Sequence, residues 1–429
     1  MLFRSTRIIY LSIVSLTSQT ALAEDWTLEK VLATAEAHSP TEDRIHATLD
    51  AARLARWETV TRLGPTLSVG ASYTLNDQEV TTTLPAGVDA TGQPVTQELV
   101  IVPEEQRGAS VVVSMPLFDP PSYLAIRQAS RNLAATEAEG EDQASLFRLV
   151  VAGAYLDVVV ADARYDVAVQ DLERVNQRWQ QITARAEVGS ERHSAVLRAE
   201  ADRLGAVQSS AAARIQAEAS RDILAIYVGE EVKGTLQPIP SPPLMVPTQE
   251  MLMANGAVQA ALARREMAAA SRTQTWVSLL PRVDGRLSYN LADETFQNPD
   301  GESWAATVSG TWVLFNSGGR TLAGLKGGAN LEVADAAYRE VVEKIWRDMV
   351  NTQATAQAAA ELVGVAEARV KAAEVAAAET RADYEVGAAL LVDVQGADVA
   401  LAQARMAWVE AMAAASRANI SLQHLYGRL

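Results

Sequence analysis

The side chains that most often carry chemistry are few and scattered in this sequence. Of the four histidines, at positions 38, 46, 193 and 424, His38 and His46 are the closest pair, eight residues apart. A zinc-binding helix places two histidines four residues apart, so this spacing does not favour a metal site. Residues 319–324 have the glycine spacing of a phosphate-binding loop but lack the Lys-Ser or Lys-Thr that must follow, so we interpret them as a turn from strand to helix.

The remaining reactive groups do not form a catalytic pattern either. There is no Gly-x-Ser-x-Gly motif, and the absence of cysteine excludes a disulfide framework or a lipidated thiol. The 53 acidic residues are spread along helix faces, where solvation explains them, and the formal net charge of −16 argues against a nucleic acid partner. We therefore predict a protein that is not an enzyme and that has no cofactor and no metal.

The first residues predict export. Residues 1–23 contain Arg4 and Arg7, an apolar stretch at 8–16, and a small-residue cleavage site at 21–23. A single membrane anchor is the alternative, but spanning a bilayer needs about 20 apolar residues. We expect no other segment to be long and apolar enough to form a transmembrane helix, so any membrane insertion must use strands.

The same pattern occurs twice along the chain. The segment 117–118, Leu-Phe, returns at 314–315, and Glu-Val-Gly at 187–189 returns at 385–387. This duplication predicts two structural repeats, 24–236 and 247–429, joined by a proline-rich linker at 237–246. The first repeat has extra residues between its two strands, which predicts a longer loop at 77–107.

Each repeat contains two segments in which apolar residues alternate with small polar ones, the period of a strand. These predicted strands are 66–76, 108–117, 282–291 and 304–314. A strand of about 10 residues crosses a bilayer at a tilt, although a soluble sheet with one wet face shows the same alternation. The predicted export signal favours strands that cross a membrane over a soluble sheet. Because four strands cannot close a barrel and lipid does not tolerate an open edge, the barrel must be shared between subunits.

The rest of the chain is helical in pattern. Two proline-free stretches, 122–189 and 321–386, predict helices of about 70 residues, roughly 100 Å long at 1.5 Å per residue. Each ends at a Val-Gly step, and a shorter helix follows. The segments 26–63 and 247–280, which precede the strands, are also expected to be helical. The predicted fold is therefore mainly α with a small β part, and helices this long favour coiled-coil packing.

This combination resembles the TolC family of outer membrane factors, that is, the outer membrane efflux proteins. Besides the duplicated helix-hairpin-helix plan, the chain has Leu-Phe-x-x-Gly-Gly at 314–319 and Tyr-x-Val-Gly at 384–387, followed by Asp-Val at 393–394. The resemblance implies a homotrimer in outer membrane lipid, in which four strands per chain form one transmembrane barrel that continues into a periplasmic helical tunnel. It further implies an exit duct for drug efflux or type I protein secretion. Its partners would be a periplasmic adaptor and an inner membrane RND or ABC transporter.

The resemblance also suggests gate residues. In the family a tyrosine, an arginine and two aspartates hold the tunnel entrance closed, and Tyr384 and Asp393 match the tyrosine and the first aspartate. Ala389 stands where the arginine is expected and Gly396 where the second aspartate is expected. One Asp393 per subunit would give a ring of three carboxylates that favours cations; the alternative is an ordinary exposed helix carboxylate.

Two further groups of residues follow from the same resemblance. The adaptor-docking tips correspond to Val188, Gly189 and Ser190 and to Val386, Gly387 and Ala388, where glycine permits close backbone approach or simply ends a helix. The corners between strand and helix correspond to Pro116, Pro120 and Pro121 and to Gly318 and Gly319. From another class, the alternative function is a soluble periplasmic coiled-coil scaffold or adaptor, which would not form trimers in the outer membrane.

Overall fold

The computed structural model describes residues 26–88, 92, 94–237, 239, 245–277, 280–293 and 301–429. The predicted export signal at 1–23 and most of the predicted linker at 237–246 lie outside the described residues. The chain divides into two compact units. Unit 1 consists of Met1–Ser39, Arg148–Pro243 and Ala356–Ile420, and unit 2 of Pro40–Phe147, Leu244–Thr355 and Ser421–Leu429.

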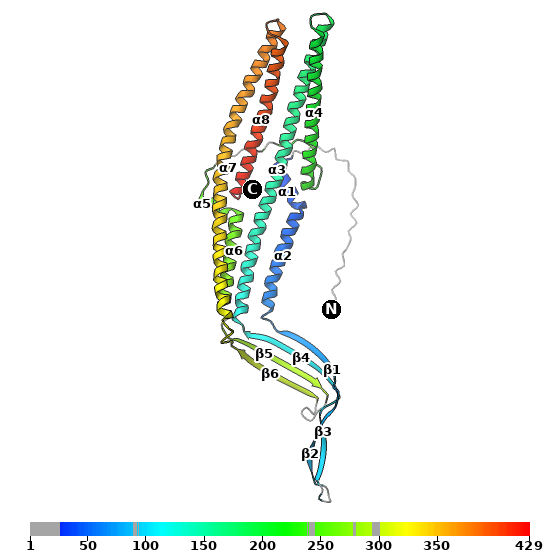
Figure 1. The fold of residues 1–429 in the computed structure, drawn as a ribbon, viewed down its shortest axis with the longest axis vertical. Coiled ribbons are helices and arrows are strands. Elements are labelled where there is room, and N and C mark those ends of the chain that lie inside the picture. The colour runs from blue at the N-terminus through cyan, green and yellow to red at the C-terminus, as the bar shows by residue number, and fades with distance from the viewer. Residues whose placement is uncertain are drawn as a thin grey trace. The chain divides into compact units, whose positions relative to one another are not determined.

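Helices make up most of the described chain. They are α1 (Leu28–His38), α2 (Pro40–Thr61), α3 (Pro120–Glu187), α4 (His193–Val228), α5 (Gln249–Ala254), α6 (Gly256–Val277), α7 (Gly319–Glu385) and α8 (Leu391–Leu425) (Figure 1). With 68 residues in α3 and 67 in α7, both long helices that the sequence predicted are present.

The predicted helical segments 26–63 and 247–280 are each divided into two helices. Ser39 separates α1 from α2, because a residue before proline is disfavoured in the helical conformation. Asn255 separates α5 from α6, and its side-chain oxygen accepts the backbone N–H of Ala257 at 3.1 Å. This contact supplies an N-terminal cap to the second helix.

Four strands form one antiparallel sheet at the four predicted places, but the fourth ends at Thr311, three residues before its predicted end at 314. They are β1 (Thr66–Leu75), β4 (Glu105–Phe118), β5 (Arg282–Ala292) and β6 (Glu302–Thr311), in the order β1-β4-β5-β6 (Figure 1). The loop predicted at 77–107 instead contains β2 (Val80–Val88) and β3 (Pro94–Val102), which pair as a separate two-stranded sheet. β-Branched residues, such as the three threonines at 81–83, explain this strand formation.

The register of the four-stranded sheet separates an apolar face from a small polar face. One row across the apolar face is Val69, Val111, Tyr289 and Trp304. On the opposite face the adjacent row is Gly70, Ser110, Asn290 and Ser303. The apolar side chains are exposed in the single chain, with Val69 at 75% and Trp304 at 72%. This face needs a cover that unit 2 does not provide in the described residues, and patches of this kind mark protein or membrane contacts.

Each unit has its own buried core. In unit 1 the largest fully buried side chains come from α1, α3 and α4: Val31, Val151, Tyr155, Val158, Ile182, Leu224 and Val228. The Tyr155 hydroxyl also donates toward the carbonyls of Trp26 and Gln237, at 2.8 and 2.7 Å, which fixes the two chain segments beside α1. In unit 2 a cluster joins α5, α6, α7 and α8 through Leu252, Val258, Ile345, Met349, Leu422 and Tyr426.

One prediction about membrane segments was wrong. By length and composition, α3 is apolar enough to cross a membrane, whereas the sequence was expected to contain no such helix after residue 23. Within α3, however, Val151, Tyr155 and Val158 are fully buried in unit 1. Core helices and membrane helices share this composition, and with 44% of the apolar window buried, part of the run belongs to this core.

Candidate functional site at the helix tips

Two turns of matching geometry end the long helices. Gly189 follows α3 and Gly387 follows α7, and both have φ +79°, the left-handed conformation that favours glycine. The Ser190 N–H donates to the Arg185 carbonyl at 2.9 Å, and the Ala388 N–H to the Asp383 carbonyl at 2.7 Å. Both turns are therefore Schellman caps, in which the residue after the glycine bonds back to the last helical turn.

The valines before these glycines are highly exposed. Val188 is 80% exposed and Val386 is 79% exposed. A Cβ built on either Gly189 or Gly387 has no atom within 4 Å. The helix tips, meaning residues 188–190 and 386–388, thus present an apolar side chain beside an open backbone surface.

Tyr384 connects the two tips. Its hydroxyl donates to Glu191 Oε1 at 2.7 Å, and Glu191 lies in the turn between α3 and α4. The Arg185 guanidinium lies 4.8 Å from the centre of the tyrosine ring, a cation–π contact. Burial makes the largest contribution to a raised pKa of Tyr384, and the hydrogen bond to Glu191 makes the next largest. The hydroxyl therefore remains protonated, and a donor, at neutral pH.

Asp393 has a local role in its own helix. Its Oδ2 accepts the backbone N–H of Leu390 at 2.9 Å, across the first turn of α8, and the side chain is exposed. This bond satisfies a free amide, and the carboxylate lies favourably near the positive end of the helix dipole. Among the described residues no hydrogen bond or ion pair joins Asp393 to Tyr384.

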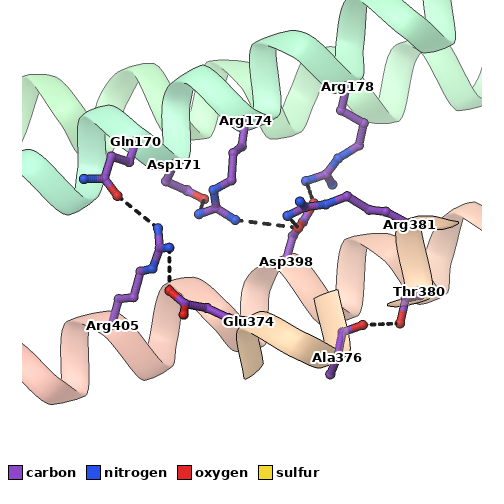
Figure 2. Close-up of polar contacts among 10 residues, drawn as sticks. All are labelled: Gln170, Asp171, Arg174, Arg178, Glu374, Ala376, Thr380, Arg381, Asp398 and Arg405. Carbon is purple, nitrogen blue, oxygen red and sulfur yellow. Dashed lines mark hydrogen bonds and ion pairs between the residues drawn. The ribbon is translucent and has the colours of Figure 1, made fainter. Parts of the chain in front are cut away.

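A group of ionic residues that the sequence did not predict lies beside these gate candidates. Asp398 of α8, whose side chain is 5% exposed, pairs with Arg178 of α3 and with Arg381 of α7, the latter at 2.6 Å (Figure 2). Arg174 Nη1 lies 3.6 Å from the same carboxylate, and its Nη2 lies 2.7 Å from Asp171. We call Asp171, Arg174, Arg178, Arg381 and Asp398 the Asp398 cluster.

Burial shapes the electrostatics of this cluster. Desolvation lowers the pKa of Arg174 and raises the pKa of Asp171, and the pairing between the two opposes both shifts. Arg405 of α8 adds a second bridge, with bonds to Gln170 at 3.0 Å and to Glu374 at 2.8 Å (Figure 2). These contacts connect α3 of the first repeat with α7 and α8 of the second.

Sequence spacing gives three of the five members of the Asp398 cluster. Asp171, Arg174 and Arg178 are three and four residues apart, which places them on one helix face. Asp398, the carboxylate that Arg174 and Arg178 share, lies more than 200 positions further along the chain. No rule of local spacing predicts that it meets them. Neither Ala389 nor Gly396, which occupy the expected lock positions, contributes a charged group.

The first corner between strand and helix contains proline. Pro116 lies near the end of β4, just before a register shift, and Pro120 and Pro121 begin α3. The Ser122 N–H donates to the Asp119 carbonyl at 3.0 Å, and the Ser122 hydroxyl bonds the Asp119 carboxylate. Proline suits the first turn of a helix because no amide is lost there.

The second corner uses glycine instead. Gly318 has φ +80° and precedes Gly319, the first residue of α7. Asn316 caps the helix, since its Oδ1 accepts the Arg320 N–H at 3.2 Å. The two repeats thus make equivalent corners with different residues.

Comparison with known proteins gives one family. The profile of the outer membrane efflux protein family matches residues 31–230 and 248–428, two segments that agree with the internal duplication. No curated protein sequence matches the chain.

Several solved structures share the fold. The outer membrane protein VceC from Vibrio cholerae is 19% identical, with a TM-score of 0.74 and coverage of 93% of this chain and 96% of that chain. CusC is 16% identical, with a TM-score of 0.80 and coverage of 96% of this chain and 95% of that chain. The MtrE outer membrane channel of Neisseria gonorrhoeae is 16% identical, with a TM-score of 0.75 and coverage of 93% of this chain and 88% of that chain. On the evidence of the family profile, this chain belongs to the outer membrane efflux proteins, with its location in the outer membrane and a helical part in the periplasm.

Proposed function

We propose that the chain is one subunit of a homotrimeric outer membrane channel that serves as the passive exit duct of a tripartite export system. The observation that carries this proposal is the four-stranded sheet, which has an exposed apolar face and a small polar face. Lipid on the apolar face and water on the polar face would satisfy both surfaces.

The sheet edges support a shared barrel. Within the described residues, β1 and β6 each have a strand partner on one side only. An open edge would leave backbone amides and carbonyls without partners in lipid, at a cost of several kcal/mol per group. Pairing β1 of one copy with β6 of the next removes both edges, and three copies with four strands each exceed the roughly eight that closure needs.

The helix tips are the proposed docking surface for a periplasmic adaptor. They present exposed Val188 and Val386 next to glycines that permit close backbone approach. The energy for transport would come from an inner membrane transporter of the RND or ABC class, because the sequence lacks a complete phosphate-binding loop. Efflux of small molecules and type I protein secretion use the same kind of duct, and the identity of this transporter distinguishes them.

The proposed gate consists of Tyr384, Asp393 and the Asp398 cluster. The contacts of Tyr384 with Glu191 and of Asp398 with Arg178 join the two repeats beside the tips. They would hold the entrance narrow until an adaptor binds. A ring of three Asp393 carboxylates would then favour cations at the entrance.

Membrane fractionation and native mass spectrometry test the channel proposal. We expect the mature protein in the outer membrane fraction and, in detergent, as a trimer that forms conducting pores in planar bilayers. A monomer that is soluble in water without detergent would refute the channel and favour a periplasmic scaffold or adaptor.

A further inference from the structure

A small pocket lies among α3, α7 and α8 in unit 1, next to the Asp398 cluster. Its volume is about 120 Å³, which is large enough for a small ion with its nearest waters. The hydrogen-bond donors on its wall are Arg174, Gln177, Arg178, Gln181, Arg185, Arg381 and Tyr384, the last of which already donates to Glu191. The chemistry of this wall is that of an anion site, because guanidinium groups donate and cannot accept.

The charges on the pocket wall itself do not balance. Four arginines line it, against the two carboxylates of Asp398 and Glu385. The next carboxylates lie outside the wall and are already engaged, Asp171 with Arg174 and Glu191 with the Tyr384 hydroxyl. Asp398 is already shared by three arginines, so it has little capacity left to neutralise the wall.

Arg174 shows the imbalance at the level of single atoms. Its Nε and Nη1 are buried and have no hydrogen-bond partner in the described part of the chain, although Nη1 is in ionic contact with Asp398. A buried donor without an acceptor is costly, and a charged donor more so. On a wall of guanidinium groups a small anion is a better partner than a neutral group, because charge-assisted hydrogen bonds are the stronger ones.

We propose that this pocket binds one small inorganic anion, of the class of chloride or phosphate, between the guanidinium groups of Arg174 and Arg178. The bound anion neutralises the excess charge and stabilises the contacts that join α3 to α7 and α8. This site stands on the pocket and its charges, so it does not depend on the proposed export function.

Thermal unfolding of the full protein in detergent tests the site. Chloride or phosphate replaces gluconate, a larger organic anion, at constant ionic strength. We expect the midpoint temperature to rise with anion concentration and to follow a single-site binding curve. Because ionic strength is fixed, general screening does not produce this rise.

Substitutions separate this site from other effects of anions. Arg174→Gln should abolish the anion-dependent rise, because it removes one of the two guanidinium groups between which the anion is proposed to lie. Gln177→Glu, which adds a negative charge to the wall without removing a member of the cluster, should weaken binding if Arg174→Gln does not fold. Arg214→Gln is the matched control, since Arg214 lies on α4 of the same unit with its side chain 59% exposed.

Crystals grown in bromide give a direct readout, with an anomalous peak expected between Arg174 and Arg178. A rise with chloride alone, phosphate alone or both identifies the ligand and supports the site. Equal midpoint temperatures in gluconate, chloride and phosphate would overturn it, as would an undiminished rise in both Arg174→Gln and Gln177→Glu.

Discussion

Replacing Asp398 with asparagine removes the carboxylate that Arg174, Arg178 and Arg381 share beside the tips. Breaking a buried ion pair by removing one partner costs about 3–5 kcal/mol, because the remaining charge stays desolvated. Arg178 is 11% exposed and Arg381 43%, so water reaches part of the cluster and the lower end, about 3 kcal/mol, applies. That free energy corresponds to a roughly 100-fold increase in the population of tips that have separated locally.

Amide hydrogen exchange measured by mass spectrometry checks this value. In Asp398→Asn, peptides from the end of α7 and the start of α8 should exchange up to roughly 100-fold faster than in the wild type, since exchange follows local opening. The control is Asp383→Asn, which removes an exposed carboxylate on α7 close to the same tip. Equal exchange in the two variants would show that the Asp398 cluster does not hold the tips together.

Three further predictions concern other parts of the chain. Gly189→Leu and Gly387→Leu each place a bulky side chain on the proposed docking surface, in a left-handed conformation that costs about 1–2 kcal/mol, so cells should lose export while trimers persist. Gly364→Leu, inside α7, is the control. Normal export by both tip variants would contradict docking at the tips. Asp393→Ala should lower the cation preference of single channels. Unchanged selectivity would refute the proposed ring of Asp393 carboxylates. Burial raises the pKa of Tyr155 to about 12, which favours the neutral hydroxyl in the folded state, so stability should be full below pH 10 and decline toward pH 12. Denaturant unfolding at these pH values should show a steeper decline in the wild type than in Tyr155→Phe, in which Tyr384 still titrates.

Local patterns were sufficient for most of the fold. The four strands were predicted because an alternation of period two reports directly which face each residue occupies. The two long helices were predicted because proline is absent between Ser122 and Gly189 and between Thr321 and Gly387. The break at Ser39 was missed although Pro40 gives a local signal for it, whereas the break at Asn255 was missed because a single cap inside a helical pattern changes the periodicity very little. The strands β2 and β3 were missed because their alternation is weak and they pair apart from the main sheet.

For the candidate site, the division between sequence and structure has a physical reason. The sequence by itself determined the duplicated plan and the glycine turns at 189 and 387, since the left-handed backbone there depends on one residue and its neighbours. Tertiary structure alone decided which charges meet. Asp398 receives Arg178 and Arg381 from two different helices, and Tyr384 reaches Glu191 from the other repeat. Such contacts depend on how separate helices pack against each other, and the periodicity of any one segment contains no information about that packing.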